Sequence, residues 1–358
     1  MASLMAFIVK LLRLLVAFLL LGAIGAGIAW HYFQSWLDVP LFLPPNGYHV
    51  ELKSGQSLGH VATQMATEGV LDYPHLLKLY ARLQSAHKIH AGEYFFAVGT
   101  TPRQLLAKLV RGDVVLYQVT LLEGWTYAQV LDALSKESHL EHKLREKTPE
   151  EQKRLLGINE SHLEGWFFPD TYSFSRNSTD IGLLKQAHQK MRDFLEQEWA
   201  GRAENLPYKT PYEALIMASI VERETGHHSE RDQIAGVFVR RLQRGMKLQT
   251  DPTVIYGMGD AYQGRIFRKH LQQPTPYNTY VINGLPPTPI ALPSAASIKA
   301  ALHPAAGNAL YFVAKGDGTS EFSASLEQHN AAVRRYQLKR RSDYRSAPPP
   351  VLLESATP

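Results

Sequence analysis

The chain has 358 residues, of which 45% are hydrophobic and 20% are charged. Both values are ordinary for a chain that folds around a packed core, so they exclude wholesale disorder. The net charge of +5 is mild for this length and no compact basic patch accompanies it, so nucleic acid is not an expected partner. The lack of cysteine excludes disulfides, thiolate metal sites, cysteine nucleophiles and a lipidated N-terminal cysteine.

The first feature along the chain is an apolar run, Leu14–Trp30, which contains no charged side chain. Since each helical residue rises about 1.5 Å, the run and its flanks can cross a bilayer core, and we expect a transmembrane anchor over residues 14–33. Lys10 and Arg13 precede the run, and no Lys or Arg follows it closely. The positive-inside rule therefore predicts a cytoplasmic N-terminus (residues 1–13), with the rest of the chain across the membrane. A cleaved signal peptide, which usually has a shorter apolar region, and a buried core helix are the alternatives.

A small unit is expected next, at residues 48–114, after a proline-containing spacer at residues 34–47. Its pattern predicts a strand, helices over Gln56–Ala66 and Pro74–Leu83, and a second strand. This order, and the opening SGQSLGHVATQM, resemble the LysM module. The resemblance implies contact with glycans that contain N-acetylglucosamine. A spacer domain that binds nothing is the alternative.

A larger region of mixed pattern, residues 115–341, makes up most of the remaining chain. Residues 342–358 contain three consecutive prolines and little apolar pattern, so we expect a disordered tail there. The predicted fold class is therefore α+β. It consists of an N-terminal transmembrane helix, a small LysM-like βααβ domain and a mixed α+β domain.

One predicted helix in this region, at residues 210–226, places carboxylates at the end of a buried segment. Thr210 and Glu213 have the spacing of a capping box at its start. Its interior is apolar on every side, which is typical of a buried helix. Glu222 and Glu224 follow directly, and two residues apart on a helix they face nearly opposite directions.

Glu222 is the better candidate for chemistry because it shares its face with the small residues Ala218 and Ser219, which would leave room for a ligand. A carboxyl on a largely buried helix is costly to ionise and tends to stay protonated. Cleavage of a glycosidic bond needs such an acid to protonate the leaving oxygen. The alternative is that both glutamates pair with Arg223, Arg231 or other bases at a fraying helix end.

Two later segments, residues 246–259 and 274–293, are rich in Pro, Thr, Asn and Tyr. Their prolines forbid long regular structure, and long irregular segments within a compact domain are usually functional. Tyrosine offers a flat apolar face with a polar tip, and Asn, Gln and Thr add adaptable hydrogen bonds. This mixture suits a sugar chain; the alternative is rigid surface loops packed by their own tyrosines.

A set of sequence blocks in the second half of the chain carries a family resemblance. The blocks are EGWFFPDTY (164–172), MASIVERET (217–225), RLQRGMKLQTDPTVIYGMG (241–259), TPYNTY (275–280), GLPPTPIALPS (284–294), HPA (303–305) and LYFVA (310–314). Together they resemble the MltG/YceG family of endolytic murein transglycosylases. The membrane anchor and the LysM-like unit also match the layout of that family.

The resemblance implies a bacterial inner-membrane protein with a single span and a periplasmic catalytic domain at residues 115–341. Such an enzyme would cleave the MurNAc-GlcNAc β-1,4 bond of nascent glycan strands, leave 1,6-anhydro-MurNAc ends and terminate strand elongation. The implied partners are peptidoglycan glycan strands and peptidoglycan synthases (penicillin-binding proteins). No cofactor and no metal are expected.

The catalytic glutamate of the family falls on Glu222. Hydrolytic glycosidases generally need a second carboxylate, whereas in a lytic transglycosylase the 6-hydroxyl of the muramic acid itself attacks, so one acid suffices. Glu222 would protonate the glycosidic oxygen and then accept the proton of the 6-hydroxyl. Six further residues are expected, from motif position and chemistry, to hold sugars or to support Glu222: Gln249, Asp251, Thr253, Tyr277, Asn278 and Tyr280.

Three other functions fit parts of the sequence. A non-catalytic glycan-binding scaffold of the wall synthesis complex would use the LysM-like unit and would not need Glu222. A two-carboxylate muramidase would pair Glu222 with Asp170 or Asp251 and would leave reducing ends without an anhydro sugar. A metal hydrolase would need a cluster of four histidines, His227, His228, His303 and His329. No Gly-rich phosphate loop or dinucleotide fingerprint is present, so no nucleotide cofactor is expected.

Overall fold

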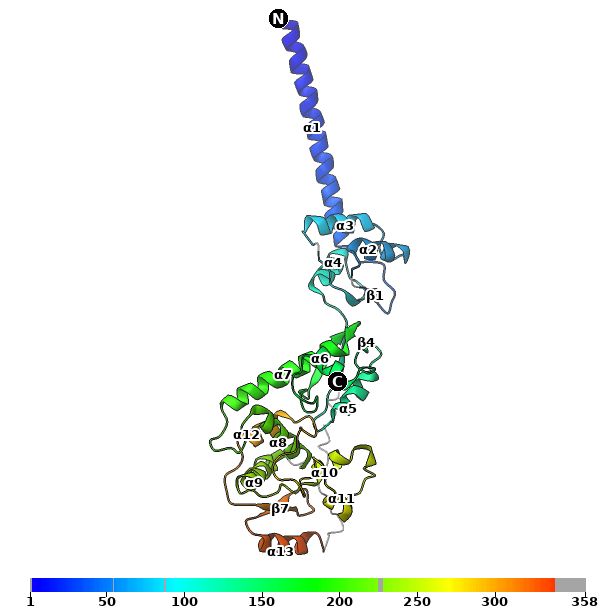
Figure 1. Cartoon of the computed structure of the whole chain (residues 1–358). Helices are drawn as coiled ribbons and strands as arrows, with labels where there is room; N and C mark the ends of the chain where they lie inside the picture. The colour runs from blue at the N-terminus through cyan, green and yellow to red at the C-terminus, as the bar shows by residue number, and fades with distance from the viewer. Residues whose placement is uncertain (1, 54, 87, 225–227, 339–358) are drawn as a thin grey trace. The chain divides into compact units, whose positions relative to one another are not determined.

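In the computed structural model the chain folds into two compact units (Figure 1). The structure describes residues 2–53, 55–86, 88–224 and 228–338. The N-terminal unit comprises the chain up to Tyr117 together with Ser175–Asn177. The C-terminal unit comprises Gln118–Phe174 and the described residues from Ser178 onward. Together they make a mixed α+β protein, as the sequence predicts. The expected disordered tail at 342–358 lies outside the described residues.

The N-terminal unit begins with the long helix α1 (Ala2–Leu37), which is apolar and largely exposed. By length and composition, residues Leu4–Leu37 of this helix are apolar enough to cross a membrane. The sequence predicts a spacer at 34–47, but α1 continues into this segment. The side chains of Phe33 and Leu37 are 8% and 0% exposed, because they lie in the core of the unit.

The rest of the N-terminal unit has the order strand, helix, helix, strand that the sequence predicts. Its elements are β1 (Tyr48–Leu52), α2 (Leu58–Thr67), α3 (Pro74–Leu83), β2 (Gly92–Phe96) and α4 (Pro102–Arg111). Strands β1 and β2 pair antiparallel, and the helices bury one apolar face each against the common core. The likeness to a LysM module remains a prediction.

A carboxylate inside the N-terminal unit joins three segments that are distant in sequence. Glu93 on β2 accepts hydrogen bonds from Tyr117 at 2.6 Å and from Arg176 at 2.7 Å. Its other oxygen lies 3.0 Å from Nδ1 of His49. Burial raises the pKa of Glu93, but these partners outweigh burial and hold the pKa at about 2. This network explains why Ser175–Asn177 belong to the N-terminal unit.

The C-terminal unit is mainly helical, with three short two-stranded sheets. Its strands are β3 (Leu116–Thr120) with β5 (Thr171–Ser175), β4 (Leu140–Glu141) with β6 (Ser178–Thr179), and β7 (Tyr311–Ala314) with β8 (Ser320–Ser323). The first two residues of β3 and the last residue of β5 belong to the N-terminal unit. Its α-helices are α5 (Tyr127–Ser135), α6 (Pro149–Leu156), α7 (Asp180–Ala200), α8 (Pro211–Glu224), α9 (Arg231–Gln243), α10 (Asp251–Met258), α11 (Arg268–Gln272), α12 (Ala295–Leu302) and α13 (Leu326–Tyr336).

Helix α8 lies at the centre of the C-terminal unit and packs against α12, α9 and α7 (Figure 1). Thr210 accepts a hydrogen bond from the backbone N–H of Glu213 at 3.3 Å, so the predicted N-terminal cap is present. Every residue from Ala214 to Val221 is buried, as the apolar pattern predicts. The expected C-terminal Gly226 lies outside the described residues.

Candidate active site

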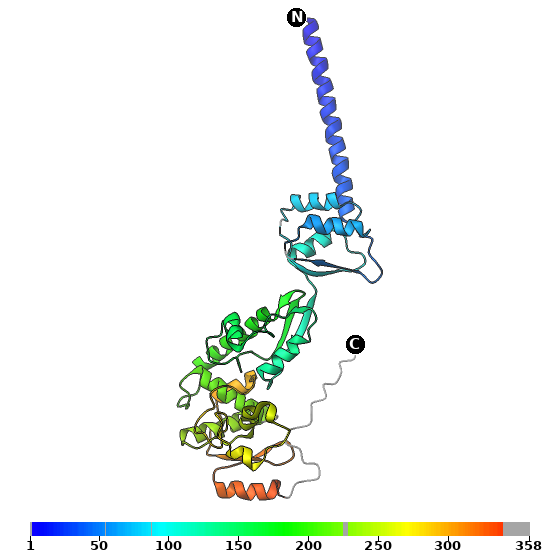
Figure 2. The ribbon, with the colours of Figure 1, turned by 45° about the vertical axis from the view of Figure 1, so that its right-hand side comes forward.

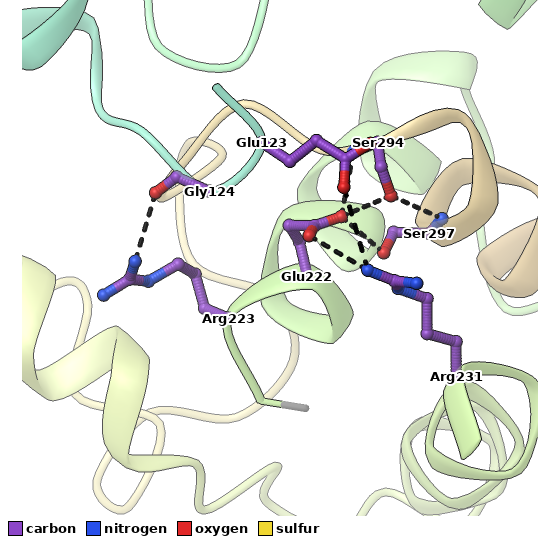
Figure 3. A network of polar contacts seen from close by, with 7 residues as sticks. All are labelled: Glu123, Gly124, Glu222, Arg223, Arg231, Ser294 and Ser297. Atoms are coloured by element: carbon purple, nitrogen blue, oxygen red, sulfur yellow. Dashed lines mark hydrogen bonds and ion pairs between the residues drawn. The ribbon is translucent and has the colours of Figure 1, made fainter. Parts of the chain in front are cut away.

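The carboxyl group of Glu222, in the last turn of α8, is enclosed by hydrogen-bond donors (Figure 3). Its Oε2 accepts from the backbone N–H of Ser294 at 2.9 Å and from the Ser294 hydroxyl at 2.5 Å. The same oxygen accepts from the Ser297 hydroxyl at 2.7 Å. Its Oε1 accepts from Nη2 of Arg231, on α9, at 3.3 Å. The carboxyl therefore lies among positioned donors rather than in the apolar setting that the sequence predicts.

The two serines belong to the N-terminus of α12. Ser294 is the N-cap residue, and its hydroxyl accepts from the backbone N–H of Ser297 at 3.2 Å while it donates to Glu222. The carboxyl of Glu222 therefore sits where the dipole of α12 and its first free N–H groups favour negative charge. The packing of α8 against α12 fixes this geometry.

Arg231 forms a buried ion pair with Glu222, so one of the pairings weighed from the sequence is present. Their side chains are only 4% and 6% exposed. A second carboxylate, Glu123, approaches the same guanidinium at 4.0 Å, and its side chain is half-exposed. Arg223 instead donates to the backbone oxygen of Gly124 at 3.1 Å. Glu222 is thus the inner end of a charged row that reaches solvent at Glu123.

The space that the sequence predicts above Ala218 and Ser219 is filled by protein. Both residues are fully buried, and the Ser219 hydroxyl accepts from the backbone N–H of Ile290 at 3.0 Å. The small side chains therefore let the chain segment before α12 approach α8 closely, instead of leaving room for a ligand. This approach brings Ser294 to Glu222.

Glu224 lies in different surroundings from Glu222, as their spacing predicts. Its Oε2 accepts from the Thr250 hydroxyl at 2.7 Å, and burial raises its pKa to about 7. It lines a cavity of about 350 Å³ together with Gln249, Asp251 and Tyr280. Tyr280 donates to Asp251 at 2.7 Å at this cavity.

A second cavity, of about 690 Å³, contains a buried acid to which the sequence analysis assigns no role. Glu164 is 7% exposed and accepts from the backbone N–H of Tyr127 at 2.9 Å and from the Tyr256 hydroxyl at 3.0 Å. Burial raises its pKa to about 7. Tyr277 and Arg223 line the same cavity. The only sequence signal for Glu164 is its place at the start of the block EGWFFPDTY.

The six residues expected at the sugar site do not form one surface. Gln249, Asp251 and Tyr280 line the smaller cavity and Tyr277 the larger. Thr253 is fully buried and donates to the backbone oxygen of Thr250 at 2.9 Å.

Asn278, the sixth of these residues, is 1% exposed, and its amide donates to the backbone oxygens of His270 and Gln273. The structure therefore places Thr253, on α10, and Asn278 in internal hydrogen bonds, and neither lines either of the two cavities. Asn278 supplies donors to backbone oxygens at the end of α11, where such groups need partners.

The acids of the two-carboxylate alternative have other partners. Asp170 forms an ion pair with Lys190, and Asp251 accepts from Tyr280. Within the described part of the chain no group of three or more His, Cys, Asp or Glu side chains is arranged to hold a metal ion. His227 lies outside the described residues.

The comparisons with known proteins identify the family. The model of the YceG-like family matches residues 50–335. The chain belongs to this family. An endolytic murein transglycosylase of Bacillus subtilis (strain 168) is 30% identical over 306 residues, which cover 80% of this chain and 84% of the relative.

Two further matches have lower sequence identity. An endolytic murein transglycosylase of Streptococcus pneumoniae (serotype 2, strain D39) is 26% identical over 356 residues, covering 89% of this chain and 64% of the relative. The crystal structure of a yceG-like protein from Listeria monocytogenes is 26% identical and covers 80% of this chain and 99% of its own, with a TM-score of 0.47.

Proposed function

We propose that this member of the YceG-like family is an endolytic murein transglycosylase, a lyase that cleaves peptidoglycan strands without hydrolysis, and that Glu222 is its catalytic group. The names of its relatives support the activity. The observation that carries the residue assignment is the enclosure of Glu222 by four hydrogen bonds from Ser294, Ser297 and Arg231.

The reaction needs one group that gives a proton and takes one back. Protonated Glu222 transfers its proton to the oxygen that links C1 of MurNAc to GlcNAc, and the bond from C1 to this oxygen breaks. The 6-hydroxyl of the same MurNAc attacks C1 and forms the 1,6-anhydro ring. The hydroxyl proton returns to the Glu222 carboxylate, so the enzyme is restored and no water is consumed.

The surroundings of Glu222 suit both halves of this cycle. The Ser294 N–H and the Arg231 guanidinium can only donate, so they stabilise the carboxylate that forms when the proton leaves. The hydroxyls of Ser294 and Ser297 can either donate or accept, so the protonated acid also keeps partners. The group is therefore held in one orientation in both of its protonation states.

The cavities that contain Glu224 and Glu164 are the proposed positions for sugars along the strand. Tyr277 and Tyr280 offer aromatic faces, and Gln249 and Asp251 offer hydrogen-bonding groups. Helix α1 is the proposed single membrane anchor, with its N-terminus in the cytoplasm and the C-terminal unit in the periplasm. Cleavage of nascent strands there would terminate their elongation next to the peptidoglycan synthases.

Mass spectrometry of cleaved strands tests this proposal. The full-length protein in detergent is incubated with uncrosslinked glycan strands, beside Glu222→Gln and a matched control, Glu150→Gln, at an exposed position on α6. We expect wild type and control to make fragments one water lighter than hydrolysis products. The Glu222→Gln variant should be slower by about 10³-fold, because it cannot supply the proton.

Each other result points to a different function. Fragments with ordinary reducing ends would indicate a two-carboxylate hydrolase. Binding of strands without any cleavage by the folded wild-type protein would indicate a scaffold. A Glu222→Gln variant with normal activity would show that another acid, with Glu224 or Glu164 as the first to test, does the chemistry.

A further inference from the structure

Helix α3 carries two different rows of side chains on the face that it turns away from the core of the N-terminal unit. The buried face consists of Leu77, Tyr80 and Ala81. On the outward side, Leu79 and Leu83 are 44% and 53% exposed. These two leucines are four residues apart and therefore lie on one stripe of the helix.

A basic row runs beside this apolar stripe. His75, Lys78 and Arg82 follow one another at three- and four-residue spacing, so they share the neighbouring stripe of the same outward face. The helix itself contains no acidic residue, although the exposed Asp72 precedes it. An exposed apolar stripe next to a basic stripe is typical of a helix that lies in the interface of a bilayer.

Helix α3 lies next to α1, the helix that is proposed to cross the membrane. Tyr80 of α3 contacts Phe33 of α1 with ring centroids 6.5 Å apart, and Tyr73, just before α3, contacts Trp36 at 6.4 Å. Figures 1 and 2 both show α3 crossing the end of α1 on the side of the unit from which α1 projects. A membrane that surrounds α1 would therefore meet α3 before the other elements of this unit.

The chain leaves no flexible tether between the apolar run and the unit. Trp30, at the end of the run, is 54% exposed, whereas Leu37, seven residues later on the same helix, is fully buried in the core of the unit. Seven helical residues span about 10 Å, a few ångströms more than the roughly 5–8 Å depth of one headgroup layer. The last turns of α1 thus hold the unit directly at the membrane surface.

We propose that α3 docks on the lipid headgroups, with Leu79, Leu83 and the exposed ring of Tyr73 in the interface and with Lys78 and Arg82 on lipid phosphates. This inference depends on the proposed membrane span of α1. Basic side chains next to an anionic leaflet gain from its surface potential, and their aliphatic stems lie along the apolar stripe. The docked helix fixes the orientation of the N-terminal unit relative to the bilayer, which α1 alone would leave free to tilt.

Single-cysteine labelling of the full-length protein in vesicles tests the docking. Because the chain has no cysteine, Leu83→Cys provides one unique position for an environment-sensitive fluorophore. The matched control is Leu116→Cys, at a leucine of similar exposure (61%) at the start of β3, in the part of that strand that belongs to the N-terminal unit. In vesicles that contain phosphatidylglycerol we expect a blue shift at position 83 and loss of its emission when headgroup-region quencher lipids are included, with neither change at position 116.

A charge reversal separates the docking from the span. We expect Lys78→Glu with Arg82→Glu to lose the blue shift and the quenching at position 83 while the protein still floats with the vesicles. Raising the salt concentration should weaken the signal in the same direction, and vesicles of phosphatidylcholine alone should give a smaller blue shift.

The outcomes that overturn the proposal are distinct from a failure of the proposed function. Equal signals at positions 83 and 116 in protein that floats with vesicles would reject the docking and leave the anchor intact. Protein that does not float would reject both the anchor and the docking. Strand cleavage by the same labelled protein in detergent reports on the transglycosylase activity by itself, whichever result the vesicles give.

Discussion

Buried carboxyl groups in this protein occur in two kinds of surroundings, and α8 carries one of each. Glu222 receives four hydrogen bonds, one of them from a buried arginine. Glu224, two residues later, receives one from a threonine, and burial raises its pKa to about 7. Burial is therefore common to both carboxyls, and their hydrogen-bond partners differ. The donors to Glu222 come from α9 and α12, and they are the reason for proposing Glu222 as the catalytic acid.

Arg231→Gln tests the buried ion pair, the contact of Glu222 for which we expect the largest effect. The change leaves Glu222 buried without its ion-pair partner, so we expect a loss of about 3 kcal/mol in stability and about 10²-fold in cleavage rate. Thermal unfolding and initial rates on glycan strands, the latter measured well below the unfolding temperature, check both. Arg154→Gln, at an exposed position on α6, is the control for loss of an arginine. An unchanged rate in folded Arg231→Gln would remove the arginine from the mechanism.

Ser297→Ala removes a neutral hydrogen-bond donor from the same site, so its expected effect is smaller. It removes one hydrogen bond to Oε2 of Glu222 while Ser294 still caps α12, so we expect about a tenfold lower rate. A positioning role should lower kcat and leave KM nearly constant, and it should change the pH profile of kcat. Ser297→Thr, which restores a hydroxyl, should recover much of the rate. A change confined to the unfolding temperature would instead indicate a purely structural serine.

Glu224→Gln examines the other kind of carboxyl through the pH dependence of stability. The folded-state pKa of about 7 lies above the ordinary 4.5, so the folded protein binds more protons than the unfolded chain between these values. Wild type therefore loses stability as the pH rises through this window, and the variant does not. We expect Glu224→Gln to be more stable than wild type at pH 8, by up to about 3 kcal/mol, and equal to it near pH 4.5. Urea unfolding across this pH range measures the difference, and parallel curves would contradict the assignment.

Glu93→Gln extends the comparison to the N-terminal unit, where hydrogen-bond donors outweigh burial in setting the pKa of Glu93. The folded-state pKa of about 2 lies below the ordinary 4.5, so the stabilisation is complete above pH 4.5 and is lost as the pH falls toward 2. We expect the variant to be less stable than wild type by about 2 kcal/mol at pH 7 and to approach it at the acid end. Unfolding of the full chain, followed at several pH values, checks the trend. A constant difference at every pH would show that shape, not charge, matters at this position.

Much of the local structure follows from the sequence because it depends on neighbours along the chain. The capping residues predict the start of α8, the apolar pattern predicts its burial, and helical spacing predicts that Glu222 and Glu224 face apart. The expected helix over Pro74–Leu83 has the same bounds as α3. The pairing of strands in the small sheets is not visible in these patterns, because strand pairing is a contact between distant segments.

The contacts of polar residues are hard to predict from the sequence, for one physical reason. Ser219 is expected to leave room for a ligand, but a backbone N–H from Ile290 occupies that room. Thr253 and Asn278 have the chemistry of sugar contacts, and that role stays a prediction; in the structure both donate to backbone oxygens. A polar side chain has the same appearance in a sequence whether its partner is a substrate or the backbone of a distant loop.

The sequence by itself determined several of the helices, the long apolar N-terminal helix and the acid worth testing, since each of these is encoded in local spacing and composition. Tertiary structure alone decided what surrounds that acid. Ser294 and Ser297 lie more than seventy residues from Glu222 along the chain, and the packing of α8 against α12 brings them to its carboxyl. These donors are distant in sequence, so only the packing of the helices could bring them to this buried carboxyl.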